Sequence, residues 1–320
     1  MPTKQEYYLG VDLGGTNMSA GLIDHTNKVL GRIKKRTRAF EGGDRVLQRI
    51  VKMSRSLVEE QGLQMKDIRG LGIGGPGAID IEKGVVLNAP NLGWEQFDVK
   101  GALSKPLGIP VAVDNDVNVA VYGEKVVGAA VRYDDVLGIW MGTGVGGALV
   151  LNGKLYYGTF LTAGEIGHTL LHPGAAWGRR TLENCASRTN IARLIVELIK
   201  ANNPSKITRM VDGDYDRVRS KVIAKAVAAK DEVACRVVRE AAHFAGIAAA
   251  NMVTVLSLPC VVLGGGLATE LGDTWADWVR ESFQQYVFPA KLQDIKIVPT
   301  KLGDDAGIVG AAIIARERLA

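Results

Sequence analysis

Two aspartates and several glycine-rich turns are the residues of this chain whose types and spacing suit chemistry. Asp12 ends an apolar run and precedes the glycines of residues 14–15, and Asp116 stands where an apolar run gives way to a helical pattern. Further glycine turns at 142–147 and 264–266 each follow a strand-like run. Glycine lets the main chain approach a ligand, so that backbone N–H groups can surround an anion. These residues predict N–H donors and carboxylates gathered at one side of a sheet.

The segment 142–147 has the Gly-x-Gly-x-x-Gly spacing of a dinucleotide-binding turn. Such a turn must be followed by a helix, whose first N–H groups receive the pyrophosphate. Here the glycines run into the apolar residues 148–151 and an Asn152-Gly153 turn, which is the pattern of a strand and a hairpin. The preceding residues 136–141 are also strand-like. We expect the loop to join two strands and to surround an anion other than NAD, which stays the weaker alternative.

Both aspartates also have a purely structural interpretation. Asp12 could satisfy the N–H groups of the turn that follows it. Asp116, at a strand-to-helix junction, could be only a helix N-cap. The glycine turns could likewise be plain turns, and only their combination with the two acids favours a site.

The composition is that of an ordinary globular protein. The chain has 320 residues, of which 47% are hydrophobic and 23% charged, and its formal net charge is +5. This length fits two medium-sized domains. The basic run from Arg32 to Arg38 is expected to be a solvated strand face, so no nucleic-acid partner is predicted. Cys185, Cys235 and Cys260 are widely spaced and odd in number, which favours a reduced, cytoplasmic setting.

No membrane partner is expected either. The N-terminus has no apolar signal-peptide core. The uncharged stretch between His243 and Glu270 is broken by Pro259 and by the glycines 264–266. Neither piece reaches the roughly 20 apolar residues that a membrane-spanning helix needs.

The elements that must position these residues follow an α/β pattern. Strands are expected at 7–13, 18–24, 29–37, 68–75 and 109–115, with helices at 44–61 and after 115, which predicts an α/β domain with a mixed sheet. The second half repeats the opening layout of glycine turn, apolar strand and Asn or Asp turn. Its expected helices are 187–201, 217–229, 231–258, 269–285 and 305–318, and its strands include 136–141, 148–151, 259–263 and 294–302.

Two similar halves predict two related domains that face one another across a cleft. We place an N-terminal α/β domain at 1–117, with the C-terminal helix 305–320 packing back on it, and a larger C-terminal α/β domain at 118–304.

Taken together, these segments resemble the ROK family of sugar kinases, within the actin-like ATPase superfamily, over essentially the whole chain. That superfamily has two ribonuclease H-like domains with mixed sheets flanking an active-site cleft. The segments that carry the resemblance are, in chain order, DLGGT (12–16), GIGGPGAID (72–80), NAPNLGW (88–94), DNDVNVA (114–120), GTGVGG (142–147), GEIGH (164–168), LENCAS (182–187), GGGLA (264–268) and GDDAG (303–307).

The resemblance implies an ATP-dependent hexokinase that acts on glucose or a close relative. Asp116 would accept the proton of the attacking hydroxyl, and Asp12 would hold Mg²⁺ through water. The residues expected around the nucleotide are Asp12, Gly14, Gly15, Thr16, Asn17, Gly142, Thr143, Gly144, Gly265, Gly266, Leu267 and Ala306. The residues expected to bind the sugar are Gly75, Asn91, Asn115, Asp116, Glu165, His168 and Glu183.

The chain departs from the family pattern after the segment 164–168, where three cysteines usually hold a structural zinc ion together with the histidine. Ala175 and Trp177 stand in place of two of them, the third is lost with a one-residue deletion, and only His168 stays in register. Four-coordinate structural zinc needs N and S ligands. We therefore expect no zinc, and expect Trp177 to hold the segment 171–183 by packing.

Several alternatives remain open at this point. The substrate could be fructose, mannose, allose, N-acetylglucosamine or N-acetylmannosamine, and the donor could be ATP, another nucleotide or polyphosphate. A homodimer is expected because relatives are commonly dimers. Part of the family consists of sugar-responsive repressors with an N-terminal helix-turn-helix. Only eleven residues precede Asp12, too few for that module, so a non-catalytic sugar sensor is the weaker hypothesis.

Overall fold

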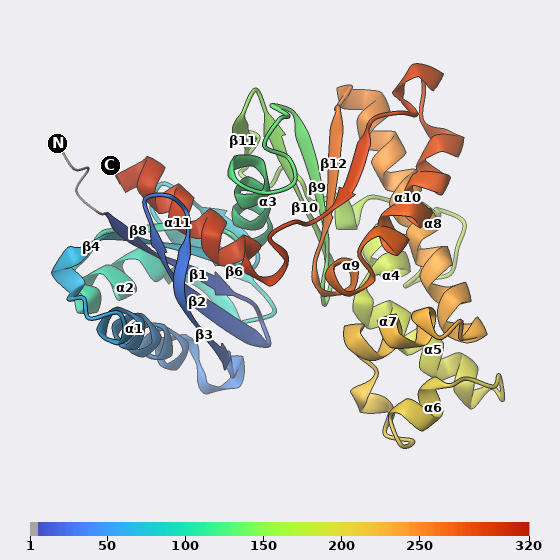
Figure 1. Cartoon of the computed structure of the whole chain (residues 1–320), viewed down its shortest axis with the longest axis horizontal. Coiled ribbons are helices and arrows are strands. Elements are labelled where there is room, and N and C mark those ends of the chain that lie inside the picture. The colour runs from blue at the N-terminus through green and yellow to red at the C-terminus, as the bar shows by residue number, and fades with distance from the viewer. Residues whose placement is uncertain (1–5, 320) are drawn as a thin grey trace. The chain divides into compact units, whose positions relative to one another are not determined.

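Two five-stranded mixed sheets form the frame of the chain, whose computed structural model describes residues 6–319 (Figure 1). Contacts divide the chain into two units. The first unit comprises the residues up to Val131, the segment Leu155–Ala163 and the residues from Asp305 onwards. The second unit comprises Arg132–Lys154 and Gly164–Asp304. The mixed α/β class predicted from the sequence is confirmed, whereas the predicted boundary at 117 falls inside a helix that the contacts keep whole in the first unit.

The sheet of the first unit has the strand order β3-β2-β1-β4-β8. Its first three strands are consecutive and antiparallel, because tight turns connect them, and β1, β4 and β8 run parallel. The strands are β1 (Tyr7–Leu13), β2 (Asn17–Asp24), β3 (Val29–Arg36), β4 (Ile68–Gly75) and β8 (Val111–Asn115). All five were expected from the sequence.

Alternation along β1 explains how helices cover both faces of this sheet. Leu9, Val11 and Leu13 are buried in one apolar cluster with residues of α1 (Gly43–Glu60) and α2 (Val99–Leu107). The residues between them lie on the other face, where α3 (Asp116–Val126) and α11 (Ala306–Leu319) pack together and against β4 and β8 (Figure 1). The C-terminal helix therefore belongs to the first unit.

A small three-stranded sheet between β4 and α2 was not predicted. It consists of β5 (Ala78–Asp80), β6 (Val85–Ala89) and β7 (Trp94–Asp98), paired antiparallel in the order β5-β6-β7. These strands are only three to five residues long, and the turns between them contain glycine and proline, so the segment shows no clear alternation. Trp94 is nevertheless buried, and its ring lies 4.6 Å from that of Phe97 between centroids.

The sheet of the second unit repeats the topology of the first, with the order β11-β10-β9-β12-β13. As in the first sheet, two consecutive antiparallel strands lead into parallel neighbours. The strands are β9 (Val136–Met141), β10 (Val145–Leu151), β11 (Lys154–Tyr156), β12 (Cys260–Gly264) and β13 (Lys296–Pro299). The predicted repeat of the two halves is thus present in the strand order.

Helices complete the second unit around the long helix α8 (Glu232–Leu256). Trp275 and Phe283 of α10 are fully buried in the same apolar cluster as the alanine-rich face of α8. The remaining helices of this unit are α4 (Leu182–Ala186), α5 (Arg188–Lys200), α6 (Ile207–Met210), α7 (Ser220–Ala228), α9 (Gly266–Leu271) and α10 (Asp273–Tyr286). The prediction of a single helix at 269–285 is wrong. The structure has two helices there, α9 and α10, because Gly272 between them adopts a φ of 54°.

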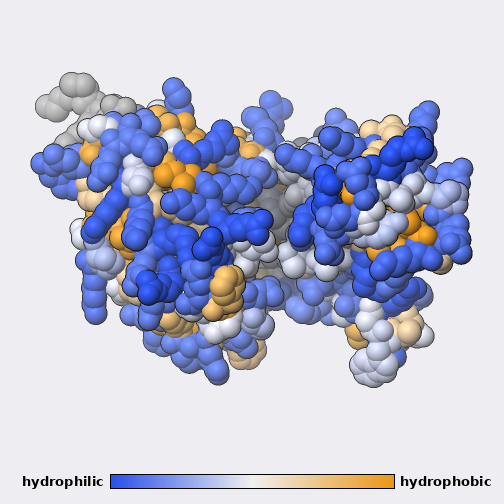
Figure 2. Space-filling view, turned by 90° about the horizontal axis from the view of Figure 1, so that it is seen from below, coloured by the Kyte–Doolittle hydropathy of each residue, from blue (hydrophilic) through white to orange (hydrophobic). Residues whose placement is uncertain are grey.

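The surface matches the charge pattern of the sequence. Residues 34–36 of β3 are exposed, as expected for a solvated strand face. The face of the molecule in Figure 2 is mostly hydrophilic, with hydrophobic residues in small separate groups. Within residues 6–319 no helix is long and apolar enough to cross a membrane.

Close backbone contact fixes α11 on the first sheet. A Cβ atom at Gly10 of β1 would lie 1.8 Å from the carbonyl oxygen of Ile308, and one at Gly72 of β4 would lie 1.8 Å from that of Ala311. On the other side of the helix, a Cβ at Gly310 would lie 1.7 Å from the carbonyl oxygen of Val119 in α3. Only glycine at these positions lets the helix lie directly on its neighbours.

We expect Gly310→Ala to lower the free energy of unfolding by roughly 1–3 kcal/mol, because overpacking outweighs the better helix propensity of alanine. Urea denaturation of the purified variant measures this loss. Gly174→Ala is the control, because a Cβ there would meet nothing within 4 Å. Equal stability of the two variants would contradict the packing argument.

Candidate functional site

The parallel strands of the first sheet bring the predicted acidic residues to one edge. In register, Asp12 of β1 pairs with Gly74 of β4, which pairs with Asp114 of β8. Gly75 pairs with Asn115 at the next position. Ligand sites of open α/β sheets lie at the carboxyl ends of such strands. The structure therefore brings Asp12, Gly75, Asn115 and Asp116 to the edge where a ligand is expected.

Asn115, and not Asp116, is the N-cap of α3. The Asn115 side-chain oxygen accepts hydrogen bonds from the backbone N–H groups of Val117 at 2.9 Å and Asn118 at 3.2 Å. Its amide nitrogen donates to the carbonyl oxygen of Gly77 at 3.2 Å. Asp116 is the first residue of the helix, and its carboxylate lies 2.9 Å from the N–H of Val117. The capping interpretation of Asp116 is thus wrong, since its neighbour caps the helix.

Asp12 lies against the N-terminus of α11. A Cβ atom at Gly307, in the first turn of this helix, would lie 2.7 Å from the carboxyl carbon of Asp12. The unpaired N–H groups at a helix N-terminus favour a negative charge. The absence of a side chain at position 307 thus leaves room for the Asp12 carboxylate beside a favourable dipole.

The first glycine turn is held from both sides. The Gly14 N–H donates to the carbonyl oxygen of Asn17 at 3.0 Å, and the Thr37 hydroxyl donates to that of Gly14 at 2.6 Å. A Cβ at Gly15 would lie 3.4 Å from the Cβ of Asn91. The turn predicted to bind phosphate and an asparagine predicted to bind the sugar are thus neighbours, and Thr16 and Asn17 at the end of the turn are exposed.

Two further glycine turns lie side by side in the second unit. The first, Gly142-Thr143-Gly144, joins β9 to β10, so the strand-to-strand connection predicted for it is correct. The other follows β12, and a Cβ at Gly265 would lie 2.3 Å from the carbonyl oxygen of Met141 at the end of β9. Two further residues predicted for the nucleotide, Leu267 of the second unit and Ala306 of the first, are buried.

Arg188 and Glu183 support the turn after β9. The Arg188 guanidinium donates to the Thr143 hydroxyl at 3.1 Å, and the Arg188 N–H donates to the carbonyl oxygen of Gly142 at 3.1 Å. A carboxylate oxygen of Glu183 accepts from the N–H of Val145 at 3.0 Å. Burial, with Arg219 nearby, lowers the pKa of Arg188 from its ordinary value. Arg188 was not predicted from the sequence, where its only signal is a cation directly after the helix cap Ser187.

The predicted sugar residues Glu165 and His168 are exposed and flank a short 3₁₀ turn, Ile166–His168. A Cβ at Gly167 in this turn would lie 1.9 Å from the carbonyl oxygen of Val145. Glu183 and the turn Ile166–His168 therefore both contact the backbone of Val145, the first residue of β10.

Backbone hydrogen bonds hold the segment 171–183, and the predicted packing of Trp177 is wrong. Trp177 is 88% exposed, with the Arg180 guanidinium 4.2 Å from its ring centroid. The Arg180 carbonyl oxygen accepts from the N–H groups of Leu171 at 2.9 Å and His172 at 3.1 Å. The N–H of Leu182 donates to the carbonyl oxygen of Thr169 at 3.1 Å. Across residues 6–319 no group of three His, Cys, Asp or Glu side chains is arranged to hold a metal ion.

Comparisons with known proteins agree with this arrangement. Residues 8–318 match the ROK family. The chain is 32% identical to a glucokinase of Halalkalibacterium halodurans, over 98% of this chain and 96% of that one. It is 28% identical to a xylose repressor of Caldicellulosiruptor bescii, covering 94% of this chain and 76% of the repressor. Among solved structures, a ROK family glucokinase from Streptomyces griseus in complex with glucose and AMPPNP has a TM-score of 0.87 and 30% identity, with 97% and 99% of the two chains covered.

Because Trp177 is exposed, we expect Trp177→Ala to change the free energy of unfolding by no more than about 0.5 kcal/mol. Leu182→Ala is the comparison in the same segment, because Leu182 is fully buried and its truncation should cost roughly 2–5 kcal/mol. Chemical denaturation of both variants measures the difference. A loss at Trp177 as large as that at Leu182 would show that the tryptophan packs after all.

Proposed function

We propose that glucose is the substrate of this chain, which belongs to the ROK family and is an ATP-dependent sugar kinase. The product would be glucose 6-phosphate, with Asp116 as the general base. The observation that carries the proposal is the row across the first sheet in which Asp12, Gly74 and Asp114 pair and Asn115-Asp116 begin α3. Glucose is favoured over other hexoses because relatives at 30–32% identity are glucokinases.

The chemistry needs a proton acceptor beside the attacking hydroxyl. The hydroxyl oxygen forms a bond to the γ-phosphorus while the bond from that phosphorus to the bridging oxygen breaks, and the electron pair leaves with ADP. The hydroxyl proton passes to the Asp116 carboxylate, an effect worth roughly 10²–10⁴-fold in rate. Asp116 suits this role because it begins α3 at the strand edge, next to Asn115.

The phosphates require N–H donors and positive charge. We assign this role to the backbones of Gly14, Gly15 and Thr16 in the first unit, and of residues 142–144 and 265–266 in the second. The Arg188 guanidinium, bound to the Thr143 hydroxyl, adds positive charge beside the second of these turns.

Asp12 fits a magnesium ion of the kind that nucleotides bring. Mg²⁺ is usually bound through one or two carboxylates together with waters and substrate phosphates. Asp12 offers one carboxylate at the strand edge, beside the N-terminus of α11. The ion, when bound, neutralises charge on the transferred phosphate. His168 alone does not make a zinc site, so zinc stays unexpected.

We assign recognition of the sugar to the polar groups predicted for it. The first unit offers Asn91, Asn115 and the backbone of Gly75, and the second offers Glu165, His168 and Glu183. The Asn115 side-chain oxygen is already used for capping, so Asn115 would contribute an amide N–H. The expected homodimer and cytoplasmic location remain predictions.

A panel of sugars with Mg-ATP tests the substrate. The purified protein is assayed for ADP release with glucose, mannose, fructose, allose, N-acetylglucosamine and N-acetylmannosamine, and with polyphosphate as an alternative donor. We expect kcat/KM to be highest for glucose with ATP, and no saturable binding of NAD. A preference for an N-acetyl sugar would replace glucose as the substrate. Sugar binding without any turnover would instead favour a regulator, like the xylose repressor to which the chain is similar.

We expect Asp116→Asn to lower kcat at least 100-fold, since the general base is lost. Binding of sugar and of Mg-ATP, measured by calorimetry, should change little. The matched control is Asp44→Asn, an exposed first-turn aspartate of α1 outside the site. A variant that keeps a tenth of the wild-type rate would exclude Asp116 as the base.

A further inference from the structure

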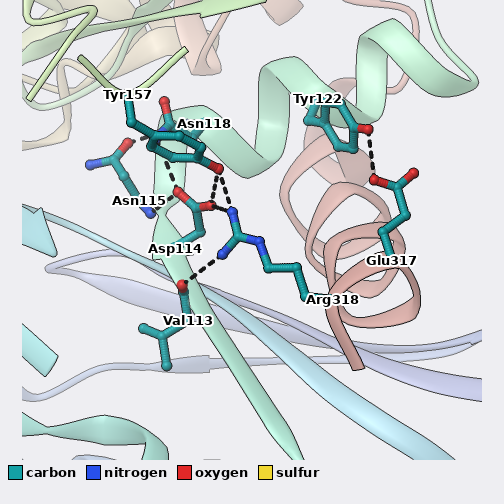
Figure 3. A network of polar contacts seen from close by, with 8 residues as sticks. All are labelled: Val113, Asp114, Asn115, Asn118, Tyr122, Tyr157, Glu317 and Arg318. Atoms are coloured by element: carbon teal, nitrogen blue, oxygen red, sulfur yellow. Dashed lines mark hydrogen bonds and ion pairs between the residues drawn. The ribbon is translucent and has the colours of Figure 1, made fainter. Parts of the chain in front are cut away.

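A fully buried carboxylate, Asp114, lies two residues before the proposed base. Asp114 is 0% exposed at the end of β8 (Figure 3). Burying a charge is costly unless it is paired and hydrogen-bonded. Four donors from three parts of the chain surround this carboxylate, so Asp114 is the centre of a polar network and not an isolated buried acid.

One carboxylate oxygen of Asp114 holds the turn that carries Asn115 and Asp116. It accepts a hydrogen bond from the backbone N–H of Asn115 at 2.7 Å and another from the side-chain amide of Asn118 at 3.0 Å. Asn118 is itself buried in the first turn of α3. Since these two donors lie on either side of Asp116, this oxygen fixes the backbone on both sides of the proposed base.

The other carboxylate oxygen is held by two residues that are remote in sequence. The Tyr157 hydroxyl donates to it at 2.6 Å, and the Arg318 guanidinium binds it at 2.5 Å. Arg318 also donates to the Tyr157 oxygen and, at 3.3 Å, to the carbonyl oxygen of Val113 (Figure 3). Burial, with the Asp114 charge nearby, raises the pKa of Tyr157, so the tyrosine remains a donor.

We propose that Arg318 and Tyr157 are positioning residues, which act through Asp114 to hold Asn115 and Asp116 in the geometry that phosphoryl transfer requires. Productive geometry depends on supporting contacts that lock the residues touching the substrate. The inference rests on the proposed function, because it concerns the same base and the same sugar-binding asparagine.

The chain offers a matched control on the same pair of helices. The Tyr122 hydroxyl of α3 donates to a carboxylate oxygen of Glu317 in α11 at 2.7 Å. This contact joins the same two helices and involves the residue next to Arg318. In Figure 3 no hydrogen bond joins this pair to Asp114 or Asn115. Its loss should therefore affect stability in the same way without disturbing the turn.

The test compares Arg318→Met, Arg318→Lys and Tyr157→Phe with Tyr122→Phe and Glu317→Gln, on whichever sugar the wild-type protein phosphorylates. We expect Arg318→Met to lower kcat/KM for the sugar at least tenfold while KM for ATP stays within twofold. Arg318→Lys, which keeps the charge, should recover part of this loss. The two control variants should stay within twofold of wild type in every parameter.

Hydrogen exchange of a peptide spanning residues 113–119 gives a readout that does not depend on activity. We expect faster exchange in Arg318→Met and Tyr157→Phe than in either control, because the N–H groups of Asn115, Val117 and Asn118 lie in this segment. This measurement separates the two proposals: a chain with no kinase activity would refute the function, while its exchange would still test the network.

The proposal is overturned if Arg318→Met folds and matches Glu317→Gln in both sugar kinetics and exchange. Thermal melting of each variant establishes that it is folded at the assay temperature. If Arg318→Met does not fold, Tyr157→Phe decides the question by the same measurements, because it removes a single hydroxyl and leaves the Asp114–Arg318 ion pair in place.

Discussion

The contact of α11 with β1 and β4 is the constraint on which the geometry of the first unit depends. Carbonyl oxygens of Ile308 and Ala311 occupy the space that side chains at Gly10 and Gly72 would fill. The helix therefore cannot slide along the sheet without a clash. Its register in turn places Gly307 beside Asp12 and Arg318 beside Asp114. Along the helix axis Gly307 and Arg318 are separated by about 16.5 Å, at roughly 1.5 Å per residue. One packing contact thus sets the surroundings of both acidic residues in the row.

The two sheets share one strand order but differ in the residue that pairs with a glycine near the strand ends. Asp12 on β1 pairs with Gly74 on β4, and at the matching place in the second sheet Trp140 on β9 pairs with Gly264 on β12. A Cβ at Gly264 would lie 2.2 Å from the Trp140 ring, so the ring covers this glycine. A Cβ at Gly74 would lie 2.4 Å from a side-chain carbon of Val119, so each glycine leaves room for a neighbouring side chain. The residue paired with this glycine is an aspartate in the first unit and a tryptophan in the second.

Local pattern predicted most of the frame and part of the site. Alternation along β1 and the glycine turns after β1 and β9 are local signals, and both strand orders agree with the predicted repeat. The small sheet at 78–98 was missed because its strands are short and lack alternation. The Asp114–Arg318 pair was missed for another reason: its members are 204 residues apart, and only the packing of α11 brings them together. Trp177 was predicted to hold the segment 171–183 by packing. Hydrogen bonds between backbone N–H and carbonyl groups hold the segment instead, and these have no sequence signature.

The position of the ion pair between the buried Asp114 and the partly exposed Arg318 favours a role in geometry over one in stability. Burying a charge costs desolvation that offsets the attraction of its partner, and apolar residues of similar size often serve as well. If Asp114 and Arg318 served only to join α11 to β8, an apolar contact would stabilise the junction equally well. A carboxylate offers what an apolar side chain cannot, namely two oxygens that bind four donors in fixed directions. Two of those donors belong to the turn that carries Asp116, and the other two come from the end of the chain and from the segment after β11. The pair thus links the register of α11 to the position of this one turn. An apolar contact of equal strength would not fix the turn, because it has no directional hydrogen bonds.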